Sequence, residues 1–173
     1  LRAHASHMPI LSSFSGGPIT SIAPSTTATA LTSLVTGLSP GEHGLIGYRV
    51  DMGSTVMNVL RWGDENGDLR RTFPPETTQP CPPFLGLSVP VLSKAELEGS
   101  GFTQAHLNGV KHMGWRASSS IPVLIRTALD AGEQFVYAYY DGIDKVAHER
   151  GFGPYYDAEL NLPTQTPAMG WLP

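Results

Sequence analysis

Residues 23–37 read APSTTATALTSLVTG, a run that changes character halfway along. Its first half is rich in threonine and serine, while larger apolar side chains enter in its second half. These apolar residues follow the i, i+3, i+4, i+7 spacing of an amphipathic helix, at Leu31, Leu34, Val35 and Leu38. The sequence therefore predicts a hydroxyl-rich turn that leads directly into a helix.

The flanks of this run predict what surrounds the helix. Residues 19–23, ITSIA, are typical of a short strand that Pro24 ends, and Gly37 is a common helix stop. A serine or threonine at positions 25–27 is expected to cap the first turn. The free N–H groups and the dipole of a helix N-terminus attract anions, phosphate above all. These hydroxyls therefore either only cap the helix or include a group that reacts with a bound anion.

The composition predicts a globular chain. Of the 173 residues, 40% are hydrophobic and 15% are charged, and the net charge is −4. These values fit neither a disordered chain nor a nucleic-acid-binding surface. The single cysteine, Cys81, excludes a disulfide within the chain.

Membrane and targeting segments are not predicted from the printed sequence. No apolar run approaches the ~18–20 residues of a membrane span, and residues 1–7 lack the apolar block of a signal peptide. The chain starts without methionine, so we expect upstream sequence to be missing. The compartment therefore stays open, with the cytoplasm favoured.

Four later segments predict two strands and two helices. Residues 89–92 are typical of a strand, with Pro90 indicating a sheet edge, and residues 93–98 have the capping pattern of a short helix. Residues 121–132 predict a longer helix. The segment 134–140, with its continuous apolar run at 135–140, then predicts a strand covered on both faces. A buried strand that follows a helix favours an α/β fold with a mainly parallel sheet.

A second polar motif follows this predicted strand. Asp141, Asp144 and His148 would lie beyond the carboxyl end of the strand, where open α/β sheets bind their ligands. A spacing of four residues places Asp144 and His148 on one side of a helix, close enough to share a metal ion. The alternative is a solvated surface pair without a ligand. Asp141 is expected to be a neighbour of the metal and not a ligand.

Taken together, the two motifs resemble a known family. Residues 24–27, PSTT, with the helix that follows them and EHG at 42–44, resemble the nucleophile segment of type I phosphodiesterases/nucleotide pyrophosphatases of the alkaline phosphatase superfamily. Residues 144–151, DKVAHERG, are similar to the metal motif of that family. The resemblance covers about residues 18–160. It implies a three-layer αβα fold with a mainly parallel sheet.

The resemblance also implies an activity and a site. Thr27 matches the threonine nucleophile, which also contacts a metal, and Asp144 and His148 match two ligands of one zinc ion of a pair. The implied reaction is metal-dependent hydrolysis of a small-molecule phosphate ester or nucleotide. Two metal ions stabilise the attacking and leaving oxygens in such a displacement. No nucleic-acid or membrane partner is expected, and the oligomeric state stays open.

Several features depart from the family pattern. Residues 1–26 contain no aspartate or glutamate, no histidine follows His148, and alanine occupies position 30, where many relatives have asparagine. Residues 161–173 form a divergent, proline-rich tail. We therefore interpret residues 1–173 as a single partial hydrolase domain, incomplete at both ends, with little activity expected. A phosphomonoesterase, a phosphonate hydrolase and a non-catalytic fragment are the alternatives.

Overall fold

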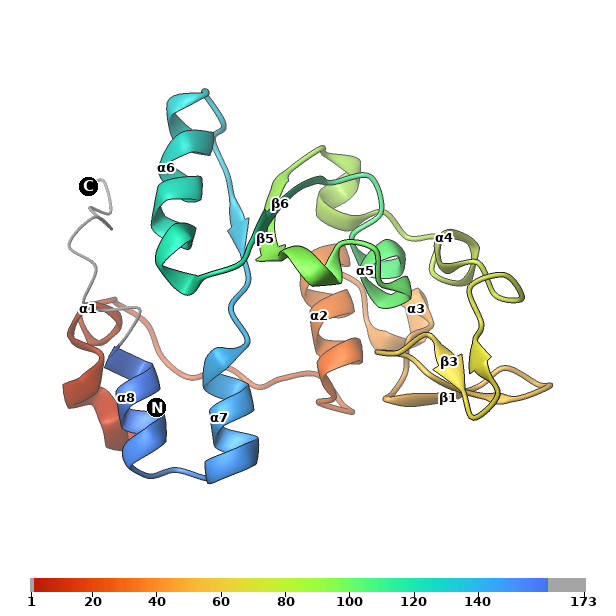
Figure 1. Ribbon diagram of the computed structural model, residues 1–173, viewed down its shortest axis with the longest axis horizontal. Helices are drawn as coiled ribbons and strands as arrows, with labels where there is room; N and C mark the ends of the chain where they lie inside the picture. Colours follow the sequence, from red (N-terminus) through yellow and green to blue (C-terminus); the bar gives the residue numbers. More distant parts are fainter. Residues whose placement is uncertain (1, 162–173) are drawn as a thin grey trace.

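The computed structural model of the chain describes residues 2–161 (Figure 1). Its helices are α1 (Pro9–Ser12), α2 (Thr27–Thr36), α3 (Pro40–His43), α4 (Pro75–Thr78), α5 (Gly101–His106), α6 (Ile121–Asp130), α7 (Gly142–Arg150) and α8 (Pro154–Asn161). Short 3₁₀ helices are η1 (Arg2–His7), η2 (Pro83–Gly86), η3 (Ala95–Leu97) and η4 (Ser118–Ser120). The strands are β1 (Arg49–Asp51), β2 (Val56–Asn58), β3 (Gly63–Asp64), β4 (Gly67–Asp68), β5 (Pro90–Lys94), β6 (Lys111–Trp115) and β7 (Tyr137–Ala138).

The parallel sheet has three strands in the order β6-β5-β7. The strand β5 pairs with β6 along its whole length and with β7 through Val91 and Leu92. The prediction that Pro90 marks an edge is wrong, because β5 lies in the middle of this sheet. Proline fits there as the first residue of the strand. The carbonyl of the preceding residue, Val89, accepts a hydrogen bond from the amide of Lys111 at 3.0 Å and so starts the ladder.

Successive side chains of β5 point to opposite faces of the sheet, and each face contacts a different helix. Val91 belongs to a cluster with Val35 of α2, whereas Leu92 packs with Ile121 of α6. Figure 1 shows α2 and α6 on opposite sides of β5. Full burial of one such side chain contributes about 1.5–3 kcal/mol. The α/β class with a parallel sheet is therefore confirmed for this part of the chain.

The predicted strand at 134–140 is shorter and more open than expected. Only Tyr137 and Ala138 pair with β5, and Phe135 is exposed. Within residues 2–161, β7 ends the parallel sheet. The prediction of a strand covered on both faces holds only in part, because Val136 and Tyr137 pack against separate clusters and are half-buried, while Phe135 and Ala138 are exposed.

The helix α2 begins at Thr27 and ends before Gly37, which adopts a left-handed conformation with φ of 73°. Its apolar pattern predicts the buried face only in part, since Val35 is buried but Leu34 is 66% exposed. The other buried positions include hydroxyl residues: Thr29, Thr32, Ser33 and Thr36. The hydroxyls of Thr32 and Thr36 donate to backbone carbonyls one turn earlier, each at 2.7 Å. These bonds allow a threonine-rich surface to be buried.

A buried histidine joins α2 to α3. The backbone amide of Leu45 donates to Nδ1 of His43 at 3.1 Å, so Nε2 carries the proton and donates to Ser33 Oγ at 2.9 Å. Burial lowers the pKa of His43, which favours this neutral form. His43 therefore has a structural role and is not part of the candidate site.

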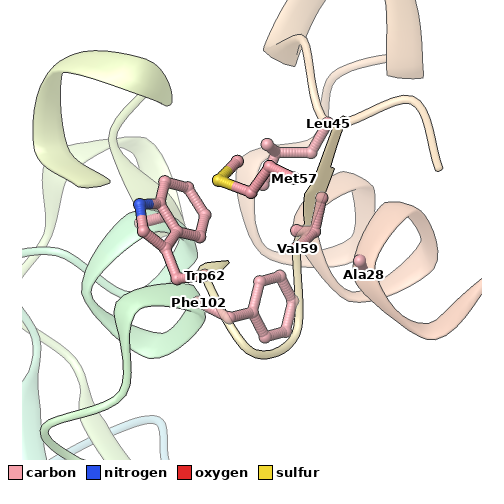
Figure 2. Close-up of a cluster of buried hydrophobic side chains, with 7 residues drawn as sticks. Ala28, Leu45, Met57, Val59, Trp62 and Phe102 are labelled. Carbon is pink, nitrogen blue, oxygen red and sulfur yellow. The ribbon is translucent and has the colours of Figure 1, made fainter. Parts of the chain in front are cut away.

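The strands β1 to β4 form a second, antiparallel sheet, and they precede the parallel strands in the sequence. Behind it, Met57 and Trp62 pack with Ala28 of α2 and Phe102 of α5 in one cluster (Figure 2). The indole Nε1 of Trp62 donates to the carbonyl of Phe73 at 2.8 Å, so its polar atom is satisfied. This cluster fixes the small sheet against the start of α2.

The N-terminal region packs against the last described helix. Met8 shares a buried cluster with Tyr156 and Leu160 of α8, and His4 Nδ1 lies 2.5 Å from Asp157 Oδ1. The strand predicted at 19–23 is wrong, since these residues form no strand and Ile19 is exposed. A strand needs a partner, and this segment instead crosses from α1 to α2 without pairing. Apart from Asn161, which ends α8, the predicted tail lies outside the described residues.

Candidate functional site

The start of α2 presents Thr27 to solvent. Thr26 is the N-cap, but its hydroxyl is hydrogen-bonded to the hydroxyl of Thr29 at 2.9 Å and makes no capping bond to the backbone. The amides at the start of a helix lack partners within the helix, and the dipole adds partial positive charge there. Thr27 therefore stands at a position that favours an anionic group.

Thr27 lines a pocket of about 250 Å³. Its polar lining side chains are contributed by distant parts of the chain and include Thr27, Ser93, His106, Asp141, Asp144 and Lys145. Ser93 lies near the carboxyl end of β5, and Asp141 follows β7. The pocket thus lies at the carboxyl ends of parallel strands, the usual ligand position in open α/β sheets.

Asp141 is held by two lysines. Lys94 Nζ lies 2.8 Å from Asp141 Oδ1, and Lys145 Nζ lies 3.0 Å from Asp141 Oδ2. The Asp141 side chain is 13% exposed, and burial acts to raise its pKa. Hydrogen bonds from Lys94 and Lys145 outweigh burial, so the pKa of Asp141 is lowered. Asp141 is therefore ionised and already engaged by two lysines.

The helix α7 has two distinct faces. Ile143, Val146 and Ala147 pack against the cluster that contains Met8 and Tyr156. Residues at 144, 145 and 148 lie on the other side of the helix, as the 100° rotation per residue requires. The packing of α7 therefore turns its charged face away from the N-terminal cluster.

Asp144 and His148 lie one turn apart on this charged face. Asp144 lines the pocket with Thr27, whereas His148 is not among the lining residues and its side chain is 80% exposed. Asp144 Oδ1 is 3.6 Å from His148 Nε2. Two ligands at 2.0–2.2 Å from a tetrahedral zinc ion are separated by roughly 3.3–3.6 Å. The spacing of this pair therefore fits one edge of a zinc site.

Residues 2–161 do not provide the further ligands that a zinc site needs. No group of three His, Cys, Asp or Glu side chains that could hold a metal occurs there. Catalytic zinc sites usually have three protein ligands. The described residues therefore fit a zinc site only in part.

The pocket also contains a buried histidine that the sequence did not indicate. His106 Nδ1 lies 2.6 Å from the carbonyl oxygen of Phe102, so it carries the proton and donates. The ring stacks on Phe102 with a centroid distance of 4.0 Å. Burial lowers the pKa of His106 to about 4. His106 is therefore neutral at pH 7, with Nε2 as an acceptor.

Lys94 and Ser93 were also missed, although a signal for them existed. Both follow the apolar run 89–92, so they lie at the carboxyl end of a predicted strand, by the same rule that selected Asp141. The contact between Lys94 and Asp141 depends on the pairing of β5 with β7, which the sequence alone does not specify.

A pocket at the carboxyl ends of parallel strands, next to a threonine at a helix start, is typical of α/β enzymes that bind small ligands. The sequence model of the type I phosphodiesterase / nucleotide pyrophosphatase family matches residues 1–130, about three quarters of the chain. The chain therefore belongs to this family, which indicates a phosphodiesterase- or pyrophosphatase-like hydrolase.

The family match divides the candidate site. Thr27 and Ser93 lie inside the matched range, whereas Asp144 and His148 follow it. A search of curated proteins found no match to the chain. Of the helices within residues 2–161, none has the length and apolar character needed to cross a membrane.

Proposed function

We propose that the chain hydrolyses phosphodiester or pyrophosphate bonds and that Thr27 is the nucleophile. The observation that supports this most directly is that Thr27 begins α2 within the matched family range and lines the same pocket as Asp144. Its hydroxyl oxygen would lose its proton and bond to phosphorus while the P–O bond to the leaving alcohol or phosphate breaks, and water would then hydrolyse the resulting phosphothreonine ester. The amides at the start of α2 would favour the charge on the phosphoryl oxygens.

Zinc dependence is part of this proposal, with two ions in a complete site. Asp144 and His148 would hold one ion, and their 3.6 Å separation is compatible with that role. Thr27 would contact a metal as well. A bound zinc ion lowers the pKa of a coordinated hydroxyl and offsets phosphoryl charge. With only two such ligands, the 173-residue chain is expected to bind zinc weakly and to turn over slowly.

The proposed substrate is a small-molecule phosphate ester or a nucleotide. Leu31, Leu60 and Phe102 give the pocket apolar walls, and its charged lining consists of Asp144 and the paired Asp141 and Lys145. The same threonine attack would serve a phosphomonoesterase or a phosphonate hydrolase, because residues outside the motifs select the substrate. We also propose that the parallel sheet and its helices belong to the three-layer αβα arrangement of the superfamily.

A non-catalytic phosphate-binding chain is the second candidate. The observation in its favour is that the described residues fit a zinc site only in part. Such a chain would bind phosphate at the start of α2 without hydrolysing an ester.

Hydrolysis of bis(p-nitrophenyl) phosphate with added zinc tests the proposal. We expect slow zinc-dependent release of nitrophenol that Thr27→Ala abolishes and Thr26→Ala largely keeps, since the Thr26 hydroxyl is bonded to Thr29. Equal activity in the two variants would discredit Thr27 as the nucleophile. If the wild-type chain releases no nitrophenol, phosphate titration followed by NMR at the Thr27 amide separates the second candidate from an inert chain.

A further inference from the structure

Ser93, His112 and Glu98 form a chain of contacts that the Thr27 reaction does not use. Ser93 Oγ lies 2.6 Å from His112 Nε2, and His112 Nδ1 lies 3.4 Å from Glu98 Oε2. The His112 side chain is 8% exposed, and its Nδ1 atom is buried without a hydrogen-bond partner. An unpaired buried polar atom is costly, by about 1–3 kcal/mol. Glu98 is exposed and can satisfy this atom by a small side-chain rotation.

The strand register explains why the serine and the histidine meet. Val91 pairs with His112 and Ser93 pairs with Gly114, so all four residues share one face of the sheet. Because Gly114 has no side chain, nothing from β6 separates Ser93 from His112. A Cβ atom at Gly114 would lie 2.8 Å from the backbone of Ala95, so glycine is needed at this position.

One side-chain rotation would assign the protons. Once Glu98 accepts a hydrogen bond from Nδ1–H, Nε2 of His112 is the acceptor for the hydroxyl of Ser93. This arrangement of nucleophile, base and carboxylate is the geometry that activates a serine for attack. We propose that Ser93, His112 and Glu98 form such a triad and that Ser93 is a second nucleophile, acting on esters with a short apolar acyl group.

The acyl group is inferred from the pocket that Ser93 lines. Leu31, Leu60 and Leu97 give this pocket an apolar part beside its charged residues, and the volume of about 250 Å³ suits a short chain. Ser93 Oγ forms a bond to the acyl carbon while its proton passes to His112 Nε2. The ester C–O bond breaks, and the alcohol leaves with that proton. Water then hydrolyses the acyl-serine, again with His112 as the base, and Glu98 stabilises the imidazolium.

The triad is independent of zinc and of Thr27, so it can be tested separately from the phosphate-ester reaction. The probe is an alkyl fluorophosphonate, added to the 173-residue chain in the presence of EDTA, followed by peptide mapping by mass spectrometry. Ser93 attacks phosphorus, fluoride leaves, and the serine proton passes through His112 to solvent. We expect a single phosphonylated residue, Ser93.

Three variants test whether His112 and Glu98 activate Ser93. His112→Gln should slow labelling by about 10²–10⁴-fold, the usual contribution of a general base. Glu98→Gln keeps the size but removes the charge, and it should slow labelling by a smaller factor. Ser119→Ala, an exposed serine outside the pocket, is the matched control and should label like the wild type. Circular dichroism confirms that each variant is folded.

The outcomes that overturn the proposal are distinct. Labelling of Thr27 in place of Ser93, or no labelling of the folded wild-type chain, rules out an activated Ser93. Labelling of Ser93 at an unchanged rate in His112→Gln rules out the triad. Because the labelled position is mapped in the wild-type chain, the result does not depend on whether Ser93→Ala folds.

Discussion

Acidification should destabilise the fold through His106, which is buried against Phe102 at the edge of the pocket. Burial lowers its pKa to about 4, from 6.5 in an unfolded chain. As the pH falls, the unfolded state therefore binds the proton first. The stability that neutral His106 contributes is fully present above pH 6.5 and is lost as the pH falls from 6.5 toward 4.

The size of this loss follows from the two pKa values. They differ by about 2.5, and each pKa unit corresponds to 1.36 kcal/mol, so the free energy of unfolding should fall by about 3 kcal/mol. That is a large fraction of the ~5–15 kcal/mol typical of a domain. The steepest slope expected from one proton is about 1.4 kcal/mol per pH unit.

Urea unfolding followed by tryptophan fluorescence at several values between pH 7.5 and pH 4 measures this slope. His106→Gln is the comparison, because it cannot titrate, and it should flatten the pH dependence by about 3 kcal/mol over the range. The variant is needed because His43, whose pKa is also lowered by burial, contributes in the same direction. Parallel pH profiles for the two proteins, or an NMR titration of the His106 ring near pH 6.5, would refute the reasoning.

Two further predictions concern packing and metal binding. A Cβ atom at Gly101 would lie 2.4 Å from Trp62, so Gly101→Ala should lower the free energy of unfolding by about 1–3 kcal/mol and lower the Tm. Gly99→Ala is the control, because Gly99 has open space around it and the Tm should not change. Thermal melts that show equal effects for the two variants would contradict this prediction. In native mass spectrometry with zinc, the Asp144→Ala variant should lose bound metal. The Asp141→Ala variant should retain it, because the Asp141 carboxylate is held by two lysines and is not a ligand. Equal zinc content in both variants would exclude Asp144 as a ligand.

The parts of the fold that the sequence predicted well are those governed by local rules. One helix starts at Thr27 and stops before Gly37, and another opens at Ile121, as predicted, although neither N-cap side chain makes the expected capping hydrogen bond. The parallel strands β5 and β7 were found from short apolar runs. The i, i+4 placement of Asp144 and His148 on one helix also followed from spacing alone.

The predictions that were wrong applied a rule based on residue type at positions where that rule does not hold. Pro90 was assigned to an edge because proline lacks an amide, but its place at the start of β5 removes that restriction. Leu34 was expected in the core, whereas Thr32 is buried instead, because a local hydrogen bond satisfies its hydroxyl. Apolar periodicity cannot detect a buried helix face formed by threonines whose hydroxyls are hydrogen-bonded. The predicted helix at 93–98 gave way to the end of β5 and the short η3, because pairing with β6 extends the strand through Lys94.

The candidate site depends most on contacts that the sequence does not encode locally. Met8 packs on Tyr156 and Leu160, and one face of α7 packs against this cluster. Because that face of α7 is packed, Asp144 lies on the opposite face of the helix and lines the pocket that contains Thr27. The N-terminal segment, which holds no residue of the site, thus sets the orientation of the helix that holds two of the three proposed site residues. Substitutions in this cluster should therefore weaken zinc binding at Asp144 and His148 without removing a ligand.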